Sequence, residues 1–241
     1  MLHSVALLEL LPDGVRGQVA AVAGHSLGEY TALVAAGSLG WEDALALVRE
    51  RGVAMAAVAA AGPRQGMSAV LGADADAVAG ALAEGEEGVA VVANLNAPGQ
   101  VVISGHLVAL EAAGDRLMAA GAKRVMPLAV AGAFHSPLMA EAAARLGRAI
   151  DAAPLTTGRP QAFNVDGKIR TEPGEVAKAL RAQLTSPVRW TACVETLVAE
   201  GVDRFLELGP GTTLTAMGKR INPDVAWMSV PGPTALAEMK R

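Results

Sequence analysis

The sequence predicts an α/β protein in which a mainly parallel sheet carries helices on both faces. Short apolar runs typical of buried strands alternate with longer segments of helical periodicity. Hydrophobic residues make up 52% of the 241 residues and aromatic residues only 3%, which favours closely packed helices on a sheet over an aromatic-rich sandwich. A G-x-S-x-G pentapeptide at residues 24–28 lies between a strand-like and a helix-like segment, as expected for a tight bend at a sheet edge.

Apolar patterns, and the residues that end them, predict the helices and strands before residue 65. They are predicted to be a helix at 1–11, a strand at 19–23 and helices at 29–36 and 41–61. The first helix is expected to stop at Pro12, which opens a Pro-Asp-Gly turn. Glu42 and Asp43 fall in the first turn of the long helix, where the helix dipole favours negative charge.

The middle of the chain follows a different order of elements. Strands are predicted at 67–71, 89–94, 100–104 and 124–128, and helices at 74–83 and 107–120. This β-α-β-β-α-β order is that of a ferredoxin-like unit. We therefore predict a small ferredoxin-like subdomain at residues 65–128, inserted into a large α/β domain formed by residues 1–64 and 129–241.

Alternation of helices and strands resumes after the predicted insert. Helices are expected at 136–152, 172–184, 190–200 and 212–219, and strands at 160–165, 204–208 and 226–230. Strands separated by helices in this way are typical of a parallel sheet.

Composition and charge exclude several classes of function. The net charge is −4 and no block of Lys or Arg occurs, so nucleic acid is not an expected partner. No run of 18 apolar residues predicts a membrane span. The apolar start lacks the basic region of a signal peptide, and the single cysteine, Cys193, suits a reducing compartment, so a cytoplasmic protein is expected. We expect no bound metal.

Ser26, at the centre of the pentapeptide, is the candidate nucleophile. A serine on a strand-to-helix turn is held in a strained bend that exposes its hydroxyl. Gly24 and Gly28 are expected at places too tight for a side chain. The N–H groups that open the following helix are directed at any anion that forms beside the serine.

The serine needs a base, because an alcohol is a poor nucleophile at neutral pH. The sequence has four histidines: His3, His25, His106 and His135. His25 is the neighbour of Ser26 on a tight turn, where adjacent side chains generally point apart. His135 follows a loop at the predicted end of a strand, where α/β proteins gather site residues, and is the best candidate.

Arg51 is the second chemical signal, since it lies in an otherwise apolar helix. A guanidinium near the nucleophile can hold a carboxylate through two parallel hydrogen bonds. The adjacent Gly52 costs roughly 1 kcal/mol relative to alanine in a helix, which suggests that another group approaches closely there.

Each of these residues also has an ordinary structural interpretation. A G-x-S-x-G pattern arises by chance in a glycine-rich chain. Taken alone, His135 could be a helix cap or a surface residue, and Arg51 an ion-paired helix residue. Cys193 is most simply a small buried hydrophobe.

Together the motifs resemble the malonyl-CoA:acyl carrier protein transacylase family, the acyltransferases of fatty acid and polyketide synthesis. The similarity runs from about Leu2 to the C-terminal helix. The motifs that carry it lie at residues 24–30, 51–55, 94–105, 134–139, 183–190 and 207–211. The family architecture, a hydrolase-like α/β core with a ferredoxin-like insert, agrees with the elements predicted above.

The resemblance implies a role for each catalytic residue. Ser26 would carry the malonyl ester, and His135 would act as general base and then as general acid. The backbone carbonyl of Gln183 would orient the histidine, and the Leu27 backbone N–H would be an oxyanion donor. Arg51 would pair with the malonyl carboxylate.

The resemblance also implies a substrate site and a partner. Asn96, Gln100, Phe134 and Met55 occupy motif positions expected to bind substrate, and Phe134 fits the malonyl-selective pattern. The substrate would be malonyl-CoA, and the partner an acyl carrier protein whose phosphopantetheine thiol accepts the acyl group. No cofactor of the enzyme itself is implied.

One departure from the family affects the start of the chain. Family members begin with a strand and a G-Q-G-S-Q loop that supplies a second oxyanion N–H, and nothing before Ser26 resembles this loop. The chain is therefore expected to be N-terminally truncated, with that segment upstream, lost or supplied by another chain. Two alternatives remain: a serine esterase or patatin-like hydrolase using Asp166, and a remnant that binds carrier protein without full activity.

Overall fold

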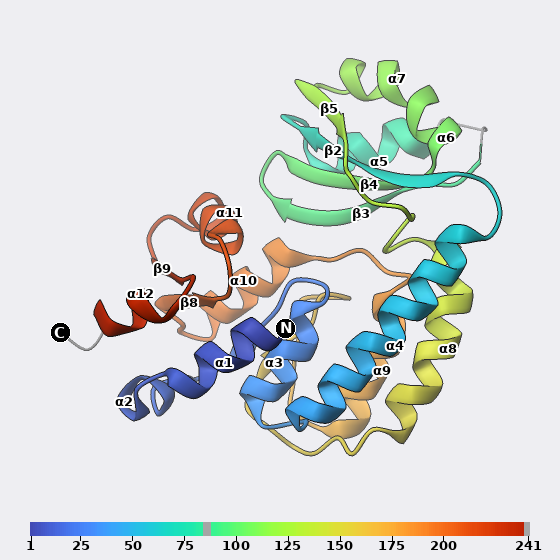
Figure 1. The fold of residues 1–241 in the computed structure, drawn as a ribbon. Helices are drawn as coiled ribbons and strands as arrows, with labels where there is room; N and C mark the ends of the chain where they lie inside the picture. The colour runs from blue at the N-terminus through green and yellow to red at the C-terminus, as the bar shows by residue number, and fades with distance from the viewer. Residues whose placement is uncertain (84–87, 239–241) are drawn as a thin grey trace. The chain divides into compact units, whose positions relative to one another are not determined.

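The computed structural model describes residues 1–83 and 88–238 (Figure 1). The chain divides into two compact units. Unit one consists of Met1–Val48, Ala153–Ala177 and Thr191–Arg241, and unit two of Arg49–Ala152 and Lys178–Trp190. Helices and strands alternate in both, which makes the protein α/β as predicted.

These units divide the chain at other positions than the predicted boundaries near residues 64 and 128. Unit two also holds the second half of helix α4 (Trp41–Ala60), helix α8 (Ala140–Ala152) and the end of helix α9 (Pro173–Gln183). Polar contacts tie these helices together. Arg145 Nε on α8 donates to Glu50 Oε1 on α4 at 2.5 Å, and Arg181 on α9 pairs with Asp151 at the end of α8. The order of predicted strands and helices does not reveal such long-range pairs.

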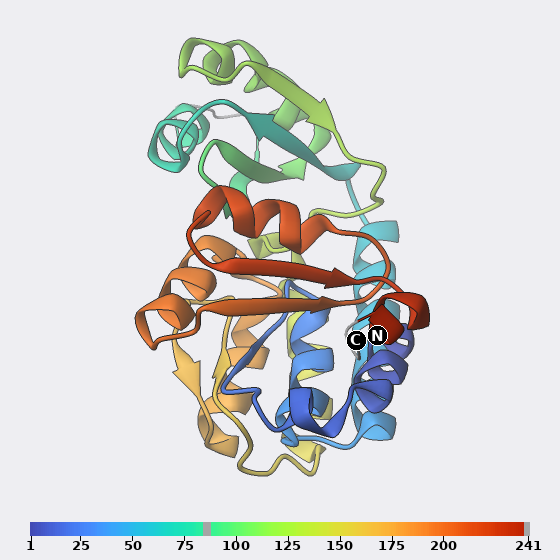
Figure 2. The same ribbon diagram turned by 90° about the vertical axis from the view of Figure 1, so that its left-hand side faces the viewer.

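The strands of unit one form two small sheets. Its strands are β1 (Val22–Ala23), β6 (Gln161–Ala162), β7 (Ile169–Arg170), β8 (Arg204–Leu208) and β9 (Ala226–Val230). β1 pairs with β6 in parallel and β6 with β7 antiparallel, while β8 and β9 form a separate parallel pair (Figure 2). The strands predicted at 19–23 and 160–165 are shorter than expected, because the chain turns sharply after each pair of residues.

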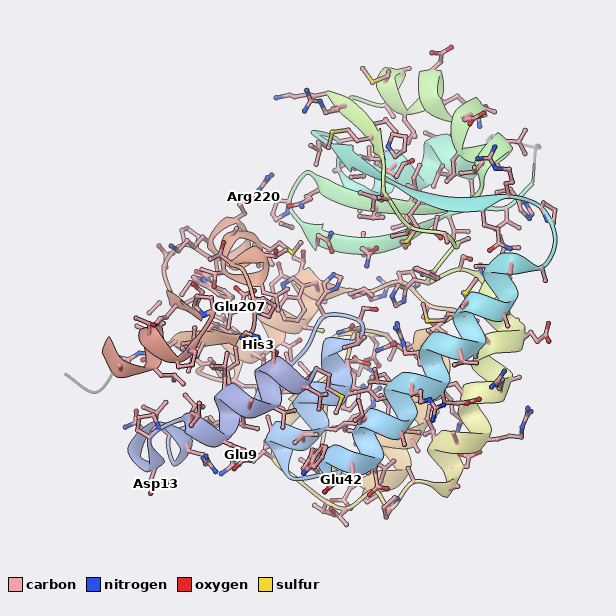
Figure 3. The ribbon with its side chains drawn as sticks, in the orientation of Figure 1. His3, Glu9, Asp13, Glu42, Glu207 and Arg220 are labelled. Carbon is pink, nitrogen blue, oxygen red and sulfur yellow. The ribbon has the colours of Figure 1, made fainter. Side chains whose placement is uncertain are left out.

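The helices of unit one surround these strands. They are α1 (Leu2–Leu10), α2 (Asp13–Arg16), α3 (Gly28–Ala36), α10 (Trp190–Ala199), α11 (Thr213–Ile221) and α12 (Pro233–Glu238), with the adjoining parts of α4 and α9. α1 ends before Pro12, as predicted, but the predicted Pro-Asp-Gly turn is the start of a short helix, with Pro12 as the N-cap of α2. The Glu207 carboxylate on β8 caps α11 by accepting hydrogen bonds from the N–H groups of Leu214 and Thr215, at 3.0 and 2.7 Å. The Glu207 side chain is labelled in Figure 3.

Unit two is built around one four-stranded sheet. Its elements in chain order are β2 (Gln65–Leu71), α5 (Ala75–Ala83), β3 (Ala90–Ala97), β4 (Gln100–His106), α6 (Leu107–Ala112), α7 (Gly114–Ala119) and β5 (Arg124–Pro127). The strand order is β3-β4-β2-β5, and every neighbouring pair is antiparallel. The single helix predicted at 107–120 is divided at Ala113, which is fully buried in the core of this unit together with Leu110 and Leu117.

Candidate active site

The candidate nucleophile lies on the turn between β1 and α3 in unit one. Ser26 has φ 51°, and only one other non-glycine residue in the described part of the chain has a positive φ. That backbone conformation costs about 1–3 kcal/mol for a residue with a side chain, so the surrounding structure must hold it in place. This is the strained strand-to-helix turn that the pentapeptide predicts.

The two glycines of the pentapeptide have different roles. A Cβ on Gly24 would lie 2.0 Å from the backbone carbonyl atoms of Gly28 and 2.6 Å from the backbone nitrogen of Glu29. A Cβ on Gly28 would meet nothing within 4 Å. The prediction that the turn excludes side chains is therefore right for Gly24 and wrong for Gly28, because Gly28 already belongs to α3 and directs its missing side chain into open space.

A buried asparagine that the sequence motifs do not single out holds the turn. Asn164 Oδ1 accepts a hydrogen bond from the Ser26 N–H at 2.7 Å, and its Nδ2 donates to the Gly24 carbonyl at 2.9 Å. The Asn164 backbone N–H donates to Glu29 Oε1 at 2.5 Å. One signal is present in the sequence, since a polar residue just after a strand of an α/β sheet is a frequent site position.

Leu27 follows the nucleophile as the N-cap residue of α3. Its carbonyl accepts from the Tyr30 N–H at 3.2 Å, and its side chain is 37% exposed. The Ser26 N–H is bound to Asn164. The next backbone donor along the turn is the Leu27 N–H, at the N-terminus of α3, where the helix dipole favours an anion.

The candidate base lies in unit two and is almost fully buried. His135 is 3% exposed and is the second non-glycine residue with positive φ, at 57°. Its Nδ1 lies 3.1 Å from the backbone carbonyl oxygen of Gln183, which ends α9. A carbonyl can only accept, so Nδ1 carries the proton, and in the neutral ring Nε2 carries the lone pair.

The residue after His135 fixes the loop. Ser136 Oγ donates to the Ala133 carbonyl at 2.6 Å and accepts from the Leu138 N–H at 3.2 Å. The helix predicted to begin at residue 136 therefore begins as a short 3-10 helix, η1 (Pro137–Met139), before α8. Pro137 stands in the first turn of η1, where no backbone N–H is needed, and Ser136 caps that turn.

The candidate carboxylate-binding residue, Arg51, is buried on α4 with 6% of its surface exposed. Met55 lies four residues further along the same face and is 7% exposed. The inference that Gly52 marks a close approach is wrong. Gly52 is on the exposed side of α4, and a Cβ there would meet nothing within 4 Å.

The other predicted substrate residues lie on the sheet of unit two and on the loop before His135. Asn96 is buried near the end of β3, and Gln100 begins β4 across the turn that joins the two strands. Phe134 packs against the cluster that contains Met67 and Val102.

The predicted site residues therefore fall into two groups. Ser26 and Leu27 belong to unit one. The second group belongs to unit two and contains Arg51, Met55, Asn96, Gln100, Phe134, His135 and Gln183. Within its own unit each group is preorganised by hydrogen bonds or burial.

Asp166, the acid of the alternative hydrolase interpretation, is engaged elsewhere. It forms two hydrogen bonds with the Arg170 guanidinium, at 2.9 and 2.7 Å. That pairing holds the pKa of Asp166 below its usual range. Cys193 is buried beside Asn164, and burial raises the pKa of its thiol to about 12, so it is an unreactive thiol.

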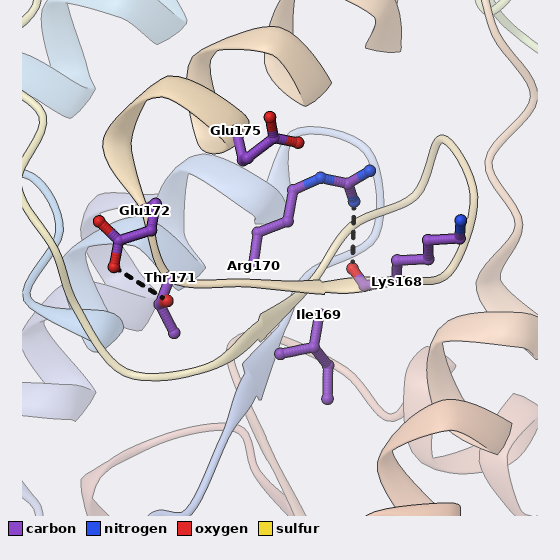
Figure 4. A pocket seen from close by; sticks show the side chains of 6 residues that line it. All are labelled: Lys168, Ile169, Arg170, Thr171, Glu172 and Glu175. Carbon is purple, nitrogen blue, oxygen red and sulfur yellow. Dashed lines mark hydrogen bonds between the residues drawn. The ribbon is translucent and has the colours of Figure 1, made fainter.

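Two surface hollows of unit one are lined by none of the predicted site residues. One, of about 310 Å³, is lined by Lys168, Ile169, Arg170, Thr171, Glu172 and Glu175 (Figure 4). Among the residues that line it, Arg170 donates to the Lys168 carbonyl at 3.2 Å, and Thr171 Oγ1 donates to Glu172 Oε1 at 3.5 Å. Over residues 1–83 and 88–238 no group of three or more acidic, His or Cys side chains is arranged to hold a metal ion. In the same part of the chain no helix has the length and apolar character needed to cross a membrane.

Known proteins are similar to this chain over most of its length. A family model described as the acyl transferase domain matches residues 2–231. The malonyl CoA-acyl carrier protein transacylase of Bacillus subtilis (strain 168) is 41% identical over 237 residues, which are 97% of this chain and 74% of that protein. The enzyme of the same name from Escherichia coli (strain K12) is 42% identical over 238 residues, 97% of this chain and 76% of that protein.

Solved structures give the same result. An acyl carrier protein S-malonyltransferase from Vibrio cholerae aligns with a TM-score of 0.91 and 39% identity, covering 98% of this chain and 78% of that one. A malonyl-transacylase in complex with its type II PKS acyl carrier protein aligns with a TM-score of 0.92 and 38% identity, covering 98% and 76%. The chain therefore belongs to the acyl transferase domain family, among the malonyl CoA-acyl carrier protein transacylases.

Proposed function

We propose that this chain transfers a malonyl group from malonyl-CoA to the phosphopantetheine thiol of an acyl carrier protein, through a malonyl ester on Ser26. The observation that carries the proposal is the pair of strained, hydrogen-bonded residues, Ser26 at φ 51° and His135 at φ 57°. Strain at two residues whose side chains suit acyl transfer supports a catalytic role for both. The names of the relatives support the choice of substrate and partner.

In the first half-reaction, Ser26 Oγ attacks the thioester carbonyl of malonyl-CoA while His135 Nε2 takes the hydroxyl proton. The carbonyl oxygen becomes an oxyanion that the Leu27 N–H stabilises, a donor worth about 2.7–4 kcal/mol in comparable enzymes. The intermediate then collapses, the C–S bond breaks, and the imidazolium returns its proton to the coenzyme A thiolate. Malonyl-serine remains.

The second half-reaction repeats these steps with the carrier protein thiol as nucleophile. His135 takes the thiol proton, sulfur attacks the ester carbonyl, and the proton passes to the leaving Ser26 oxygen. Gln183 keeps the imidazole in the required tautomer throughout, because its carbonyl continues to accept from Nδ1.

Arg51 makes the acyl choice in this proposal. A bidentate pair with the free carboxylate of the malonyl group would compensate the burial of the guanidinium, whereas an acetyl group has no carboxylate to offer it. Met55, Phe134, Asn96 and Gln100 complete the proposed substrate site. The reaction uses no cofactor of the enzyme itself, and we place it in the cytoplasm.

Two finer statements about the fold belong to the same proposal. The antiparallel order β3-β4-β2-β5 with its intervening helices supports a ferredoxin-like subdomain in unit two. The parallel pairs β1-β6 and β8-β9 support a hydrolase-like core in unit one.

Intact-mass measurement after exposure to malonyl-CoA tests the proposal. The wild-type chain should gain one malonyl group, and Ser26→Ala should gain none. Arg51→Ala should lower the malonylation rate more than the acetylation rate from acetyl-CoA, with Arg49→Ala as the control on the same helix. A wild-type chain that gains no mass would refute the proposal, as would equal effects of Arg51→Ala on both acyl groups. If Asp166→Asn abolished ester hydrolysis, the patatin-like alternative would replace it.

A further inference from the structure

Asn164 is a buried side chain whose hydrogen bonds surround the candidate nucleophile. We propose that Asn164 is a positioning residue for Ser26: its carboxamide holds the turn in the conformation from which the hydroxyl reacts. The inference rests on the proposed function, since it takes Ser26 as the nucleophile. Asn164 touches the backbone of the turn, so it acts through Ser26 and not on the substrate.

The Asn164 carboxamide binds residues 24 and 26, which lie on either side of His25 in the turn. Its oxygen accepts from the Ser26 N–H at 2.7 Å, and its nitrogen donates to the Gly24 carbonyl at 2.9 Å. A planar amide that binds residues 24 and 26 together fixes the orientation of both peptide groups. It thereby fixes the φ of 51° at Ser26, which a relaxed serine would leave for a commoner conformation.

Asn164 is itself held rigidly. It is 0% exposed, and its backbone N–H donates to Glu29 Oε1, on a glutamate that is 1% exposed in the first turn of α3. The loop that carries it is closed by a hydrogen bond from the Phe163 N–H to the Lys168 carbonyl at 3.0 Å. A fully buried side chain anchored at both its backbone and its amide can transmit a fixed geometry.

The Asn164 carboxamide also determines which backbone N–H can bind an oxyanion. The Ser26 N–H points into the carboxamide oxygen of Asn164, so it is committed to holding the turn. Loss of that oxygen would release the N–H and let the turn relax. The hydroxyl and the Leu27 N–H would then move together, because they are adjacent on the same turn.

The test measures the first half-reaction separately from substrate binding. Rapid-quench intact-mass spectrometry gives the rate of malonyl-Ser26 formation, and titration gives the Kd of malonyl-CoA. Asn164→Ala should lower the acylation rate by about 100-fold, the loss typical of a reacting group displaced by about 1 Å, with less than a threefold change in Kd. Gln161→Met is the matched control, because Gln161 is also 0% exposed in the preceding strand but donates to the Glu29 carbonyl at 3.2 Å and not to the turn. It should acylate within threefold of wild type.

The pH dependence of the acylation rate of Asn164→Asp would stay unchanged if Asn164 had only a structural role. In that variant an ionised carboxylate would accept from Ser26 but repel the Gly24 carbonyl, whereas the protonated acid would restore the donor. The Glu29 carboxylate faces the same site and favours the protonated form, and the Cys193 thiol beside it stays neutral since its pKa is about 12. The acylation rate of Asn164→Asp relative to wild type should therefore rise at least fivefold from pH 8.5 to pH 6.

The possible outcomes distinguish failure of the proposed function from failure of the inference about Asn164. If the wild-type chain forms no malonyl adduct, the proposed function fails, and the inference with it. If wild type acylates and Asn164→Ala acylates within threefold of it, the inference alone fails. If Asn164→Ala does not fold, Asn164→Asp carries the test, and a rate ratio that stays flat with pH overturns the inference.

Discussion

Replacing Gly24 with alanine gives the sharpest test of the turn. The new Cβ would lie 2.0 Å from the Gly28 carbonyl atoms, and real Cβ contacts under 3.0 Å essentially never occur. The backbone must therefore move by about 1 Å or more to make room for it. Overpacking of this kind costs about 1–3 kcal/mol, and loss of the Asn164 bond to the Gly24 carbonyl adds about 1 kcal/mol. We expect Gly24→Ala to lower the free energy of unfolding by about 2–4 kcal/mol.

Thermal unfolding followed by circular dichroism checks this expectation. For a chain of this size about 2–4 °C of Tm corresponds to 1 kcal/mol, so Tm should fall by about 5–15 °C. Gly28→Ala is the matched control, because its Cβ enters open space and its position is helical, and Tm should stay within about 3 °C of wild type. Equal Tm values for Gly24→Ala and wild type would refute the steric argument, and so would a larger loss for Gly28→Ala.

Three further predictions concern other parts of the chain. Gly52→Ala should stabilise α4 by about 0.5–1 kcal/mol in an unfolding titration, since the site is helical and open; a loss of stability would show that a neighbour approaches there after all. Cys193 should resist a thiol-specific disulfide reagent at pH 8 in the folded protein and react fully in denaturant, because burial raises its pKa to about 12; rapid labelling of folded protein would contradict this. Asp166→Asn should lower Tm at neutral pH, and the deficit should shrink as pH falls below about 4, because a carboxylate with a lowered pKa stabilises the fold only while it is ionised; a deficit that grows in acid would have the wrong sign.

Local patterns in the sequence predict most helices and the strands of unit two. The strand predicted at 100–104, for example, lies inside β4, because an interior strand that is buried along its length shows in the sequence as a short apolar run. The strands of unit one are predicted less well. β1 and β6 have only two residues each, and no pattern predicts β7, since so short a strand leaves no periodic signal.

The candidate site, too, is predicted from the sequence only where its residues are close neighbours along the chain. The turn at Ser26 follows from a glycine, a serine and their flanks, all neighbours in sequence. Asn164 lies 138 residues from Ser26, and no local pattern links the two. The Ser-x-x-Glu spacing from Ser26 to Glu29 even resembles a helix capping box, but the Glu29 carboxylate binds the Asn164 backbone instead. Only the fold reveals such a partner.

The group that orients His135 belongs to the main chain, at Gln183. No amino-acid replacement at that position deletes a peptide oxygen, so a scan of single variants would pass over the most direct neighbour of the imidazole. The same oxygen has no ionisation of its own at any working pH. The Gln183 carbonyl should therefore add no inflection of its own to a pH–rate profile of this enzyme.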